Sequence, residues 1–435
     1  MLKNSLIYFV LLLLLVEING QAFTPYVRHL HTATLIQDKL YILSGFDDVH
    51  GSEGIGGRQF FYLDVSAPLN TQQLSWNDLS SNDVVPSHIG AAAVKGGANN
   101  NTLILYGGRN LTNVEIPASV FMFDPQSNSW SIPIITGEFF IKRRSLTAII
   151  DNNGKIYLFG GRLLVYNNYV NDMLVLDSIN LSWGKGNSLN GPSPRVNYGA
   201  TLLPNQNILY IGGADNLSES LPLDMVYLYD TINNNWTTVK TFGTIPSSRF
   251  GITSVLGLDG QQVIVFGGKG VDIDGSNSLY TLNINTFEWI IPNVSGNIPG
   301  NRYMHKANVI GNYMVVTFGF GYNETDSDVL LLDISNNDEF KWTTDFIPPK
   351  TLRQLSAKKT KDVIIGIIVG SIIGGVLLLS IGFFILYKWN KNKKVQVGVA
   401  NIPDNNNKLE NQSGKGEVLT TDNKVINSDQ ETRQV

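Results

Sequence analysis

Short apolar runs alternate with polar turns along most of this chain, and the alternation follows one repeated pattern. In residues 155–183 an apolar run ends in two glycines, a variable loop leads to a second apolar run that ends in Asp177, and Trp183 follows six residues later. The pattern recurs six times, and its tryptophans lie 53 or 54 residues apart. They are Trp76, Trp130, Trp183, Trp236, Trp289 and Trp342. A fixed period of this length indicates a repeat architecture.

Each repeat predicts four short strands. The first begins near an arginine, the second runs into the glycine pair, the third ends in Asp or Asn, and the fourth carries the tryptophan. The two middle strands are almost continuously apolar, as expected for strands that are covered on both faces. The arginines are Arg28, Arg143, Arg195, Arg249 and Arg302, with Ser87 at the equivalent place in the second repeat. Six such units predict an all-β fold, a six-bladed β-propeller over residues 21–345.

The two terminal repeats depart from the pattern. Ser44-Gly45 and Phe318-Gly319 stand where the other repeats have Gly-Gly, and the gap between the third strand and the tryptophan is longer. Terminal repeats are often atypical. A seventh, degenerate blade or a shared closing strand therefore stays open.

The glycine pair, the downstream aromatic residue and the spaced tryptophan resemble the kelch family over about residues 25–345. In kelch proteins the strand-entry residues and adjoining loops ring one mouth of the central channel, where peptide ligands often dock. The resemblance implies that the five repeat arginines form a cationic ring suited to a carboxylate-bearing ligand. The alternative is that each arginine pairs with the backbone or acids of neighbouring blades. The variable loops, such as 162–171, are the expected places for function.

The sequence gives little support for catalysis. The resemblance brings in copper radical oxidases of the galactose oxidase type, but these need a Tyr–Cys crosslink and this chain has no cysteine. The iron motif of the nitrile-specifier kelch proteins is absent too. His31 and His305 occupy equivalent repeat positions, which favours structural roles. The acidic segments at 272–278 and 324–328 are interpreted as solvated loops, so we expect no metal, cofactor or catalytic residue.

The two ends predict a membrane-anchored protein. Residues 1–20 resemble a secretory signal peptide, cleaved after Gly20 or Ala22. A basic stalk at 346–362 precedes 363–387, which carries no charge and is long enough for one transmembrane helix. Residues 388–435 are polar and predict a disordered cytoplasmic tail. We therefore expect a single-pass type I protein of the plasma membrane or another secretory-pathway membrane, with the propeller outside.

Two kinds of surface feature accompany this topology. Gly366, Gly370 and Gly374 share one face of the predicted span, a pattern that allows close helix pairing and hence a homodimer. Asparagines in Asn-x-Ser/Thr triplets are glycosylation candidates in an exported domain. They are Asn100, Asn110, Asn180, Asn216, Asn293 and Asn323, with Asn235 disfavoured beside a repeat tryptophan.

Charge narrows the choice of partner. Acidic residues outnumber basic ones between 21 and 342, which argues against a nucleic-acid partner. We predict a module that binds a protein or glycan, in adhesion or receptor-like recognition. The alternatives are a membrane-tethered carbohydrate-active enzyme that uses the central channel and a scaffold with no small ligand. Aromatic and arginine anchors at the channel mouth would favour binding, and converging carboxylates and histidines would favour catalysis.

Overall fold

The structure is a computed structural model that describes residues 23–47, 59–81, 88–110, 119–138, 141–164, 168–270, 278–321, 328–349 and 381–389. The chain divides into two units, 1–352 and 353–435. The predicted signal peptide, most of the stalk and span, Asn323, and the three glycines of the predicted pairing face lie outside the described residues. Residues 381–389 are helical. Within the described parts of the chain, no helix is long and apolar enough to cross a membrane.

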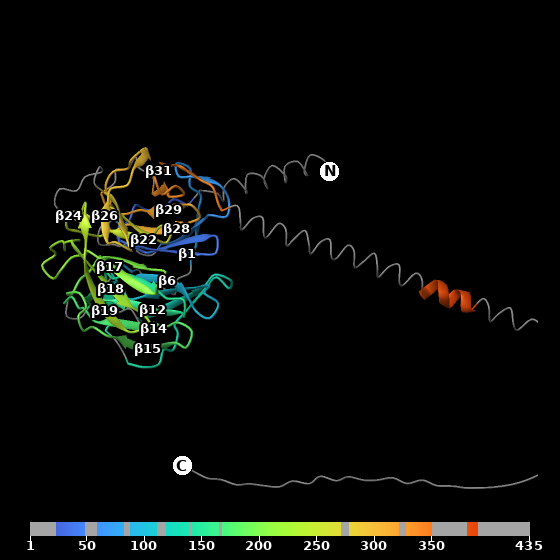
Figure 1. The fold of residues 1–435 in the computed structure, drawn as a ribbon. Coiled ribbons are helices and arrows are strands. Elements are labelled where there is room, and N and C mark those ends of the chain that lie inside the picture. Colours follow the sequence, from blue (N-terminus) through green and yellow to red (C-terminus); the bar gives the residue numbers. More distant parts are fainter. Residues whose placement is uncertain are drawn as a thin grey trace, which may run out of the picture. The chain divides into compact units, whose positions relative to one another are not determined.

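Unit 1 is built from four-stranded antiparallel sheets that follow one another along the chain (Figure 1). The described ranges contain six of them, and each consists of four core strands that are consecutive in the sequence apart from short accessory strands. The six predicted blades are therefore confirmed. A seventh blade does not occur among these residues, and each blade takes its four core strands from a single repeat.

The strands keep the same order in every blade, from the central channel outward. The innermost strands are β1 (Thr32–Ile36), β6 (Ala92–Gly96), β11 (Ala148–Ile150), β16 (Gly199–Leu202), β22 (Thr253–Leu256) and β28 (Lys306–Ile310). The second strands are β2 (Lys39–Leu43), β7 (Thr102–Tyr106), β12 (Lys155–Phe159), β17 (Asn207–Ile211), β23 (Gln262–Phe266) and β29 (Tyr313–Thr317). The third strands are β3 (Phe60–Asp64), β8 (Val120–Asp124), β14 (Met173–Asp177), β18 (Met225–Asp230), β25 (Leu279–Asn283) and β30 (Val329–Asp333). The outer strands are β5 (Trp76–Asp78), β9 (Ser129–Ser131), β15 (Ser182–Gly186), β19 (Asn235–Lys240), β26 (Glu288–Ile290) and β31 (Phe340–Thr343).

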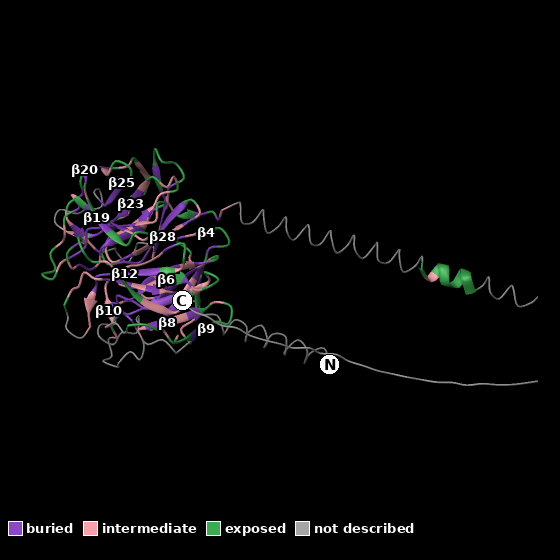
Figure 2. Ribbon diagram, turned by 60° about the horizontal axis from the view of Figure 1, so that its bottom comes forward, coloured by how far each residue is buried: buried purple, intermediate pink, exposed green. Residues whose placement is uncertain are grey.

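The core lies between neighbouring blades, and Figure 2 shows buried strands throughout the sheets. Four residues of each second strand are buried, because both faces of this strand are covered. In five of the six blades the repeat tryptophan packs on an aromatic ring of the preceding blade. For example, Trp236 lies 5.0 Å from Phe159 and Trp342 lies 5.2 Å from Phe266, between ring centroids. Burying one large side chain of this kind contributes about 2–3 kcal/mol. The repeated tryptophan therefore joins blade to blade.

The turn between the third and fourth strands is set by its Asp or Asn. Asp177 Oδ1 accepts hydrogen bonds from the backbone N–H groups of Ile179 (2.9 Å) and Asn180 (2.8 Å). The same turn forms at Asp124, Asp230 and Asn283. Asx side chains stabilise turns in this way. The Asp or Asn that ends the third strand therefore fixes the turn to the fourth strand in these four blades.

The linker that leaves one blade covers the outer edge of the next. β20 (Phe242–Gly243) pairs parallel with β26, and β27 (Val294–Gly296) pairs parallel with β31. A single bridge joins Thr136 to Ser182 in the third blade in the same way. An open sheet edge exposes unpaired backbone groups that template aggregation. In these blades the linker occupies that edge.

The ring closes between the sixth and first blades. β32 (Asp345–Phe346) follows the last outer strand and pairs with β4 (Leu69–Asn70), which lies in the long gap before Trp76. Thr71 N–H also donates to Thr344 O at 2.8 Å. Phe346 is buried, with its ring 5.1 Å from that of Tyr313. The longer turn of the first repeat thus holds the end of the last one.

Candidate functional site

The glycine pair has one geometry in all six blades. Its first residue has a left-handed backbone, with φ of 67° at Gly107 and 63° at Gly160. Ser44 (φ 60°) and Phe318 (φ 45°) adopt the same conformation in the terminal repeats, where a side chain costs about 1–2 kcal/mol. The second residue donates its N–H to a carbonyl of the next blade, as Gly161 does to Arg195 O at 3.0 Å. The degenerate pairs therefore preserve the turn.

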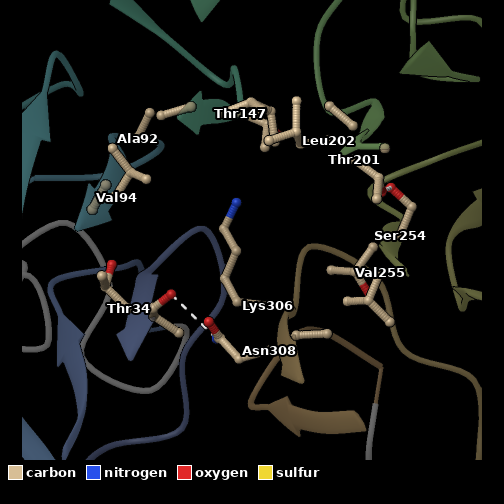
Figure 3. A pocket seen from close by; sticks show the side chains of 18 of the residues that line it. Thr34, Ala92, Val94, Thr147, Thr201, Leu202, Ser254, Val255, Lys306 and Asn308 are labelled. Carbon is tan, nitrogen blue, oxygen red and sulfur yellow. Dashed lines mark hydrogen bonds between the residues drawn. The ribbon is translucent and has the colours of Figure 1, made fainter. Parts of the chain in front are cut away.

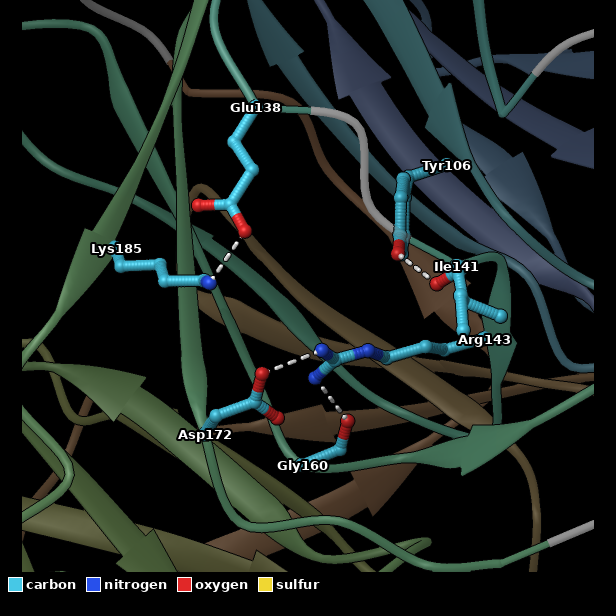
Figure 4. A network of polar contacts seen from close by, with 7 residues as sticks. All are labelled: Tyr106, Glu138, Ile141, Arg143, Gly160, Asp172 and Lys185. Atoms are coloured by element: carbon cyan, nitrogen blue, oxygen red, sulfur yellow. Dashed lines mark hydrogen bonds and ion pairs between the residues drawn. The ribbon is translucent and has the colours of Figure 1, made fainter. Parts of the chain in front are cut away.

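The five repeat arginines are buried, with exposures between 0 and 4%. In each, Nη1 donates to the carbonyl of the first residue of the glycine-pair turn in its own blade: Ser44, Gly160, Gly212, Gly267 and Phe318. Figure 4 shows this contact for Arg143, whose Nη2 also pairs with Asp172 Oδ2 at 2.7 Å. Arg28, Arg143, Arg195, Arg249 and Arg302 therefore belong to the framework and do not form an accessible cationic ring. Their backbone partners lie within their own blades, whereas the sequence alternative placed them in neighbouring blades.

The second repeat needs a correction of one residue. His88, not Ser87, occupies the arginine position, because Gly45 N–H donates to His88 O at 3.0 Å as the other second glycines do to the arginines. His88 is buried, with its ring 5.6 Å from that of Phe121. Ser87 lies outside the described residues. The histidine ring takes the place of the guanidinium.

Two residues beyond each of these positions, six residues form a closed ring of backbone hydrogen bonds. All six have a left-handed backbone, with φ from 51° to 68°. Each N–H donates to the carbonyl of the equivalent residue in the preceding blade, over 2.7–3.1 Å. The members of this peptide ring are Leu30, Gly90, Ser145, Asn197, Gly251 and Met304. The ring encircles one end of the central channel and fixes the blades at equal spacing.

Around the peptide ring lie six short antiparallel pairs, which we call the crown. Each joins the residue after an arginine position to the residue after a glycine pair. The crown pairs are His29–Phe46, Ile89–Arg109, Arg144–Arg162, Val196–Ala214, Phe250–Lys269 and Tyr303–Phe320. Two of them form the short strands β10 (Arg143–Arg144) with β13 (Arg162–Leu163), and β21 (Arg249–Phe250) with β24 (Lys269–Gly270). None of these twelve residues carries a carboxylate.

One part of the crown, in blades two and three, is cationic. Arg144 faces Arg162 across β10 and β13, and Arg109 is exposed in the neighbouring pair. Burial and then the charges of Arg162 and Arg109 lower the pKa of Arg144. Within the described ranges, none of the three guanidiniums has a carboxylate partner. Like charges facing each other across two strands are destabilising, so this cluster is not explained by stability.

Another part of the crown, in blades six and one, is aromatic. The His29 ring lies 5.3 Å from those of both Phe46 and Phe320. Tyr303 lies 5.0 Å from Phe320, and the Lys269 ammonium lies 5.5 Å from the Tyr303 ring centroid. Phe320 is 40% exposed. The crown thus presents the aromatic and arginine anchors that distinguish a binding surface from a catalytic one.

Sequence reasoning did not single out Arg109, Arg144 or Arg162 as site residues. Arg162 opens the variable loop that was expected to carry function, and its guanidinium lies 5.6 Å from the Tyr169 ring centroid. A comparison of the six repeats could have found them. The residue after each glycine pair and the residue after each repeat arginine differ between repeats, whereas the glycine pair and the arginine themselves recur. The position of a residue within its repeat therefore identifies the crown residues better than its residue type does.

A cavity of about 470 Å³ runs along the channel inside the innermost strands. Figure 3 shows it lined by threonine, serine, valine and leucine side chains, with Lys306 reaching into its middle. Its lining residues include no carboxylate and no histidine. A smaller space of about 30 Å³ lies at the peptide ring.

The two repeat histidines are structural parts of the blade contacts. His31 Nε2 shares a hydrogen bond with Thr317 Oγ1 (2.9 Å), and His305 Nε2 shares one with Thr253 Oγ1 (2.8 Å). Both are buried, and burial lowers the pKa of His31 well below its usual value and that of His305 to about 3. Neutral rings joined to framework hydroxyls confirm the expected role.

The described residues contain no group of three metal-ligating side chains. The acidic segments considered for metal in the sequence lie mainly outside these residues. Of the glycosylation candidates, Asn100, Asn180, Asn216 and Asn293 are exposed and Asn110 is half-buried. Asn180 Nδ2 donates to Asp177 Oδ2 and Asn293 Nδ2 to Asp338 O. Asn235 is exposed as well.

The blade order, the glycine-pair turns and the buried repeat tryptophans define a six-bladed β-propeller of the kelch type. The chain belongs to the family described as the Attractin/LZTR1 beta-propeller, whose family model matches residues 103–330, more than half of its length.

Similar proteins share the propeller and differ in length. Acyl-CoA-binding domain-containing protein 4 of Arabidopsis thaliana is 25% identical over 355 residues, which are 78% of this chain and 50% of that protein. Host cell factor 1 of Homo sapiens is 27% identical over 237 residues, 50% of this chain and 11% of that protein. The chain thus spans half or less of the length of these relatives. A solved structure titled "Structure of YjhT" aligns with a TM-score of 0.55 at 16% identity, covering 74% of this chain and 98% of that one, which shows the fold alone.

Proposed function

We propose that this protein is a binding module that recognises an acidic segment of a partner protein through the crown. The observation that carries the proposal is the cluster of Arg109, Arg144 and Arg162, three guanidiniums held together without a carboxylate among the described residues. A cluster that costs stability is retained for another reason, and planar guanidiniums bind carboxylates bidentately. An acidic ligand would relieve the mutual repulsion of the three charges.

The aromatic part of the crown supplies the second anchor. Phe320 and Tyr303 offer partly exposed rings, and Lys269 adds a cation beside them. Binding surfaces concentrate their affinity in aromatic and arginine residues. We therefore expect the partner segment to combine acidic residues with an apolar or aromatic side chain.

The carbohydrate-active alternative has less support. A glycoside hydrolase of the usual kind uses two carboxyl groups on either side of the scissile bond. Neither the crown nor the lining of the channel cavity contains a carboxylate.

For placement, we propose a type I membrane protein with the propeller on the extracellular or lumenal side. The signal-like segment 1–20, the uncharged stretch 363–387 and the exposed Asn100, Asn180, Asn216 and Asn293 support it. The proposal includes a homodimer through Gly366, Gly370 and Gly374. Endoglycosidase treatment of the expressed chain should increase its gel mobility, and an unchanged mobility would remove the argument from glycans.

The test of the crown uses a displayed library of random peptides panned against the full-length chain. We expect selected peptides to be enriched in Asp and Glu. Reversing the three charges in Arg109→Glu, Arg144→Glu, Arg162→Glu should weaken a selected peptide about 100-fold or more, because each lost ionic contact costs about 1.5–3 kcal/mol. Fluorescence anisotropy with the labelled peptide measures the loss.

The matched control is Lys240→Glu, which reverses an exposed charge on the outer strand β19. It should leave peptide affinity within about twofold, since a screened charge far from the site contributes little. Peptides without acid enrichment, or equal binding by the crown variant, would refute recognition of an acidic segment.

A further inference from the structure

Lys306 stands alone in the channel layer that follows the peptide ring. The six residues of this layer, each two positions after a ring member, are Thr32, Ala92, Thr147, Gly199, Thr253 and Lys306. The lysine is the one long side chain of the layer, and Figure 3 shows it extending into the middle of the channel. It makes no ion pair with any residue that the structure describes. The channel therefore holds a cation without its counter-charge.

Unsatisfied hydroxyl groups lie on the neighbouring inner strand. Thr32 and Thr34 are 3% and 5% exposed, line the same cavity, and their Oγ1 atoms have no hydrogen-bond partner in the described structure. Asn308 Nδ2 donates to Ala33 O at 3.3 Å and so joins β28 to β1 at this level. A buried polar group without a partner costs about 1–3 kcal/mol. Thr32, Thr34 and Lys306 line one cavity, which therefore contains two hydroxyls without a hydrogen-bond partner and an ammonium without a counter-charge among the described residues.

The environment makes a lone cation unfavourable. The cavity lining contains no carboxylate, and desolvation lowers the pKa of Lys306 to about 8. Burial penalises the charged form, and an anion placed against it restores the charge. A ligand with a negative oxygen would satisfy the ammonium and the hydroxyls together.

We propose that the central channel binds a small molecule that carries a carboxylate, sulfate or phosphate group, with its oxygens at Lys306 Nζ and the hydroxyls of Thr32 and Thr34. The cavity of about 470 Å³ lies within the usual range for small-ligand sites, about 300–1,000 Å³. Apolar side chains such as Leu202 and Val255 line the rest of the space and contact the ligand body.

This channel site is separate from the crown. The peptide ring lies at the crown end of the channel, whereas the exposed Lys95 lines the cavity toward the far end of β6. The residues proposed to contact the ligand, Lys306, Thr32 and Thr34, line the channel cavity, and none of them belongs to a crown pair. The proposal therefore stands whether or not the crown binds a peptide.

The test measures sulfate binding to the full-length chain by isothermal titration calorimetry, at constant ionic strength with chloride as the exchanged anion. We expect saturable binding that Lys306→Met weakens about tenfold or more and Thr34→Val weakens about threefold. Acetate and phosphate titrations rank the three anion classes. Lys95→Met, which removes the exposed lysine of the same cavity, should leave the affinity within about twofold.

Sulfate affinity should also fall as pH rises through about 8, where the Lys306 ammonium loses its proton, and this dependence should vanish in Lys306→Met. Sulfate itself does not titrate there. Of the other titratable groups near the channel, His31 and His305 stay neutral because burial lowers the pKa of both, and Tyr198 stays protonated because burial raises its pKa.

Three results would overturn the site. The first is the absence of saturable binding of sulfate, phosphate and acetate. The second is equal sulfate affinity in wild type and Lys306→Met. The third is a loss of affinity in Lys95→Met equal to that in Lys306→Met, which would indicate a diffuse positive field. If Lys306→Met does not fold, Thr34→Val decides: unchanged affinity in that variant refutes the proposed hydroxyl contact. Retained peptide binding by Lys306→Met would show that crown and channel act independently.

Discussion

Arg143 and Arg144 are neighbours of the same residue type with opposite environments. Arg143 is 4% exposed, donates to Gly160 O and pairs with Asp172. Arg144 is half-buried, faces Arg162 and has no carboxylate partner among the described residues. Strand alternation turns one side chain into the blade and the other onto the crown. Residue type alone therefore says nothing about which arginine serves the fold and which serves a partner.

The two positions can be distinguished by whether the same residue type recurs there in the other blades. The Arg143 position is arginine in five blades and histidine in one, and its contact with the glycine-pair turn recurs. The Arg144 position is occupied by His, Ile, Arg, Val, Phe and Tyr around the crown. A position with the same contact in every blade has a structural role, and a position whose residue differs from blade to blade is available for recognition.

The largest expected effect comes from Arg143→Met. The change leaves the Gly160 carbonyl and the partly exposed Asp172 carboxylate without their shared donor. Losing hydrogen bonds made by a charged, buried guanidinium costs about 1.5–3 kcal/mol. Chemical denaturation of the full-length chain measures it. Arg144→Met should change stability by less than about 0.5 kcal/mol, because it removes a repulsion and no partner. Equal losses in the two variants would erase the distinction.

A glycine comparison tests the same distinction in the backbone. Gly107 has φ of 67°, and a Cβ there would clash with the Arg143 carbonyl oxygen. Gly107→Ala should therefore cost about 2–3 kcal/mol in the free energy of unfolding. Gly300 has open space around its Cβ position and no left-handed backbone, so Gly300→Ala should be neutral or slightly stabilising. A tolerated Gly107→Ala would show that the turn can relax.

A smaller effect follows from the neutral histidines. Burial lowers the pKa of His305 to about 3, while the unfolded chain keeps its usual value near 6.5. Between these values the unfolded state binds a proton that the folded state excludes, so stability falls as pH drops below about 6.5. His305→Gln should reduce the loss between pH 6.5 and 5 by about 1–2 kcal/mol. Denaturant titrations at the two pH values measure the free energy of unfolding. An equal loss of that free energy in variant and wild type would count against a structural role for neutral His305.

Much of the blade was predictable because its signals are local. Asp177 and Trp183 are six residues apart, as are their equivalents in the other three middle repeats, and their roles in the turn and in packing follow from strand geometry. The burial of Arg28 and its equivalents was harder to predict, because it depends on a left-handed residue two positions later that rotates the chain. A shift of one residue, from Ser87 to His88, was enough to misplace the second repeat.

The site was less predictable than the scaffold for a physical reason. Arg109, Arg144 and Arg162 come together only when two blades pack and two short pairs form, so no window of sequence contains the cluster. Lys306 looks in sequence like an ordinary exposed strand residue. Its isolation appears only when Thr32, Thr147 and their equivalents in the other blades enclose the channel.

The pairing of β32 with β4 has a mechanical consequence. Any tension applied to the chain beyond residue 349 reaches Asp345 and Phe346 before it reaches a blade. The pair is short, with two residues in each strand, and it lies at the junction of the last and first blades. Under a pulling force it is the first contact to bear the strain, whereas the circular peptide ring at the channel end distributes the same strain over six linkages. Under such a force we therefore expect the β32–β4 pair to separate before the strands around the channel and the crown do.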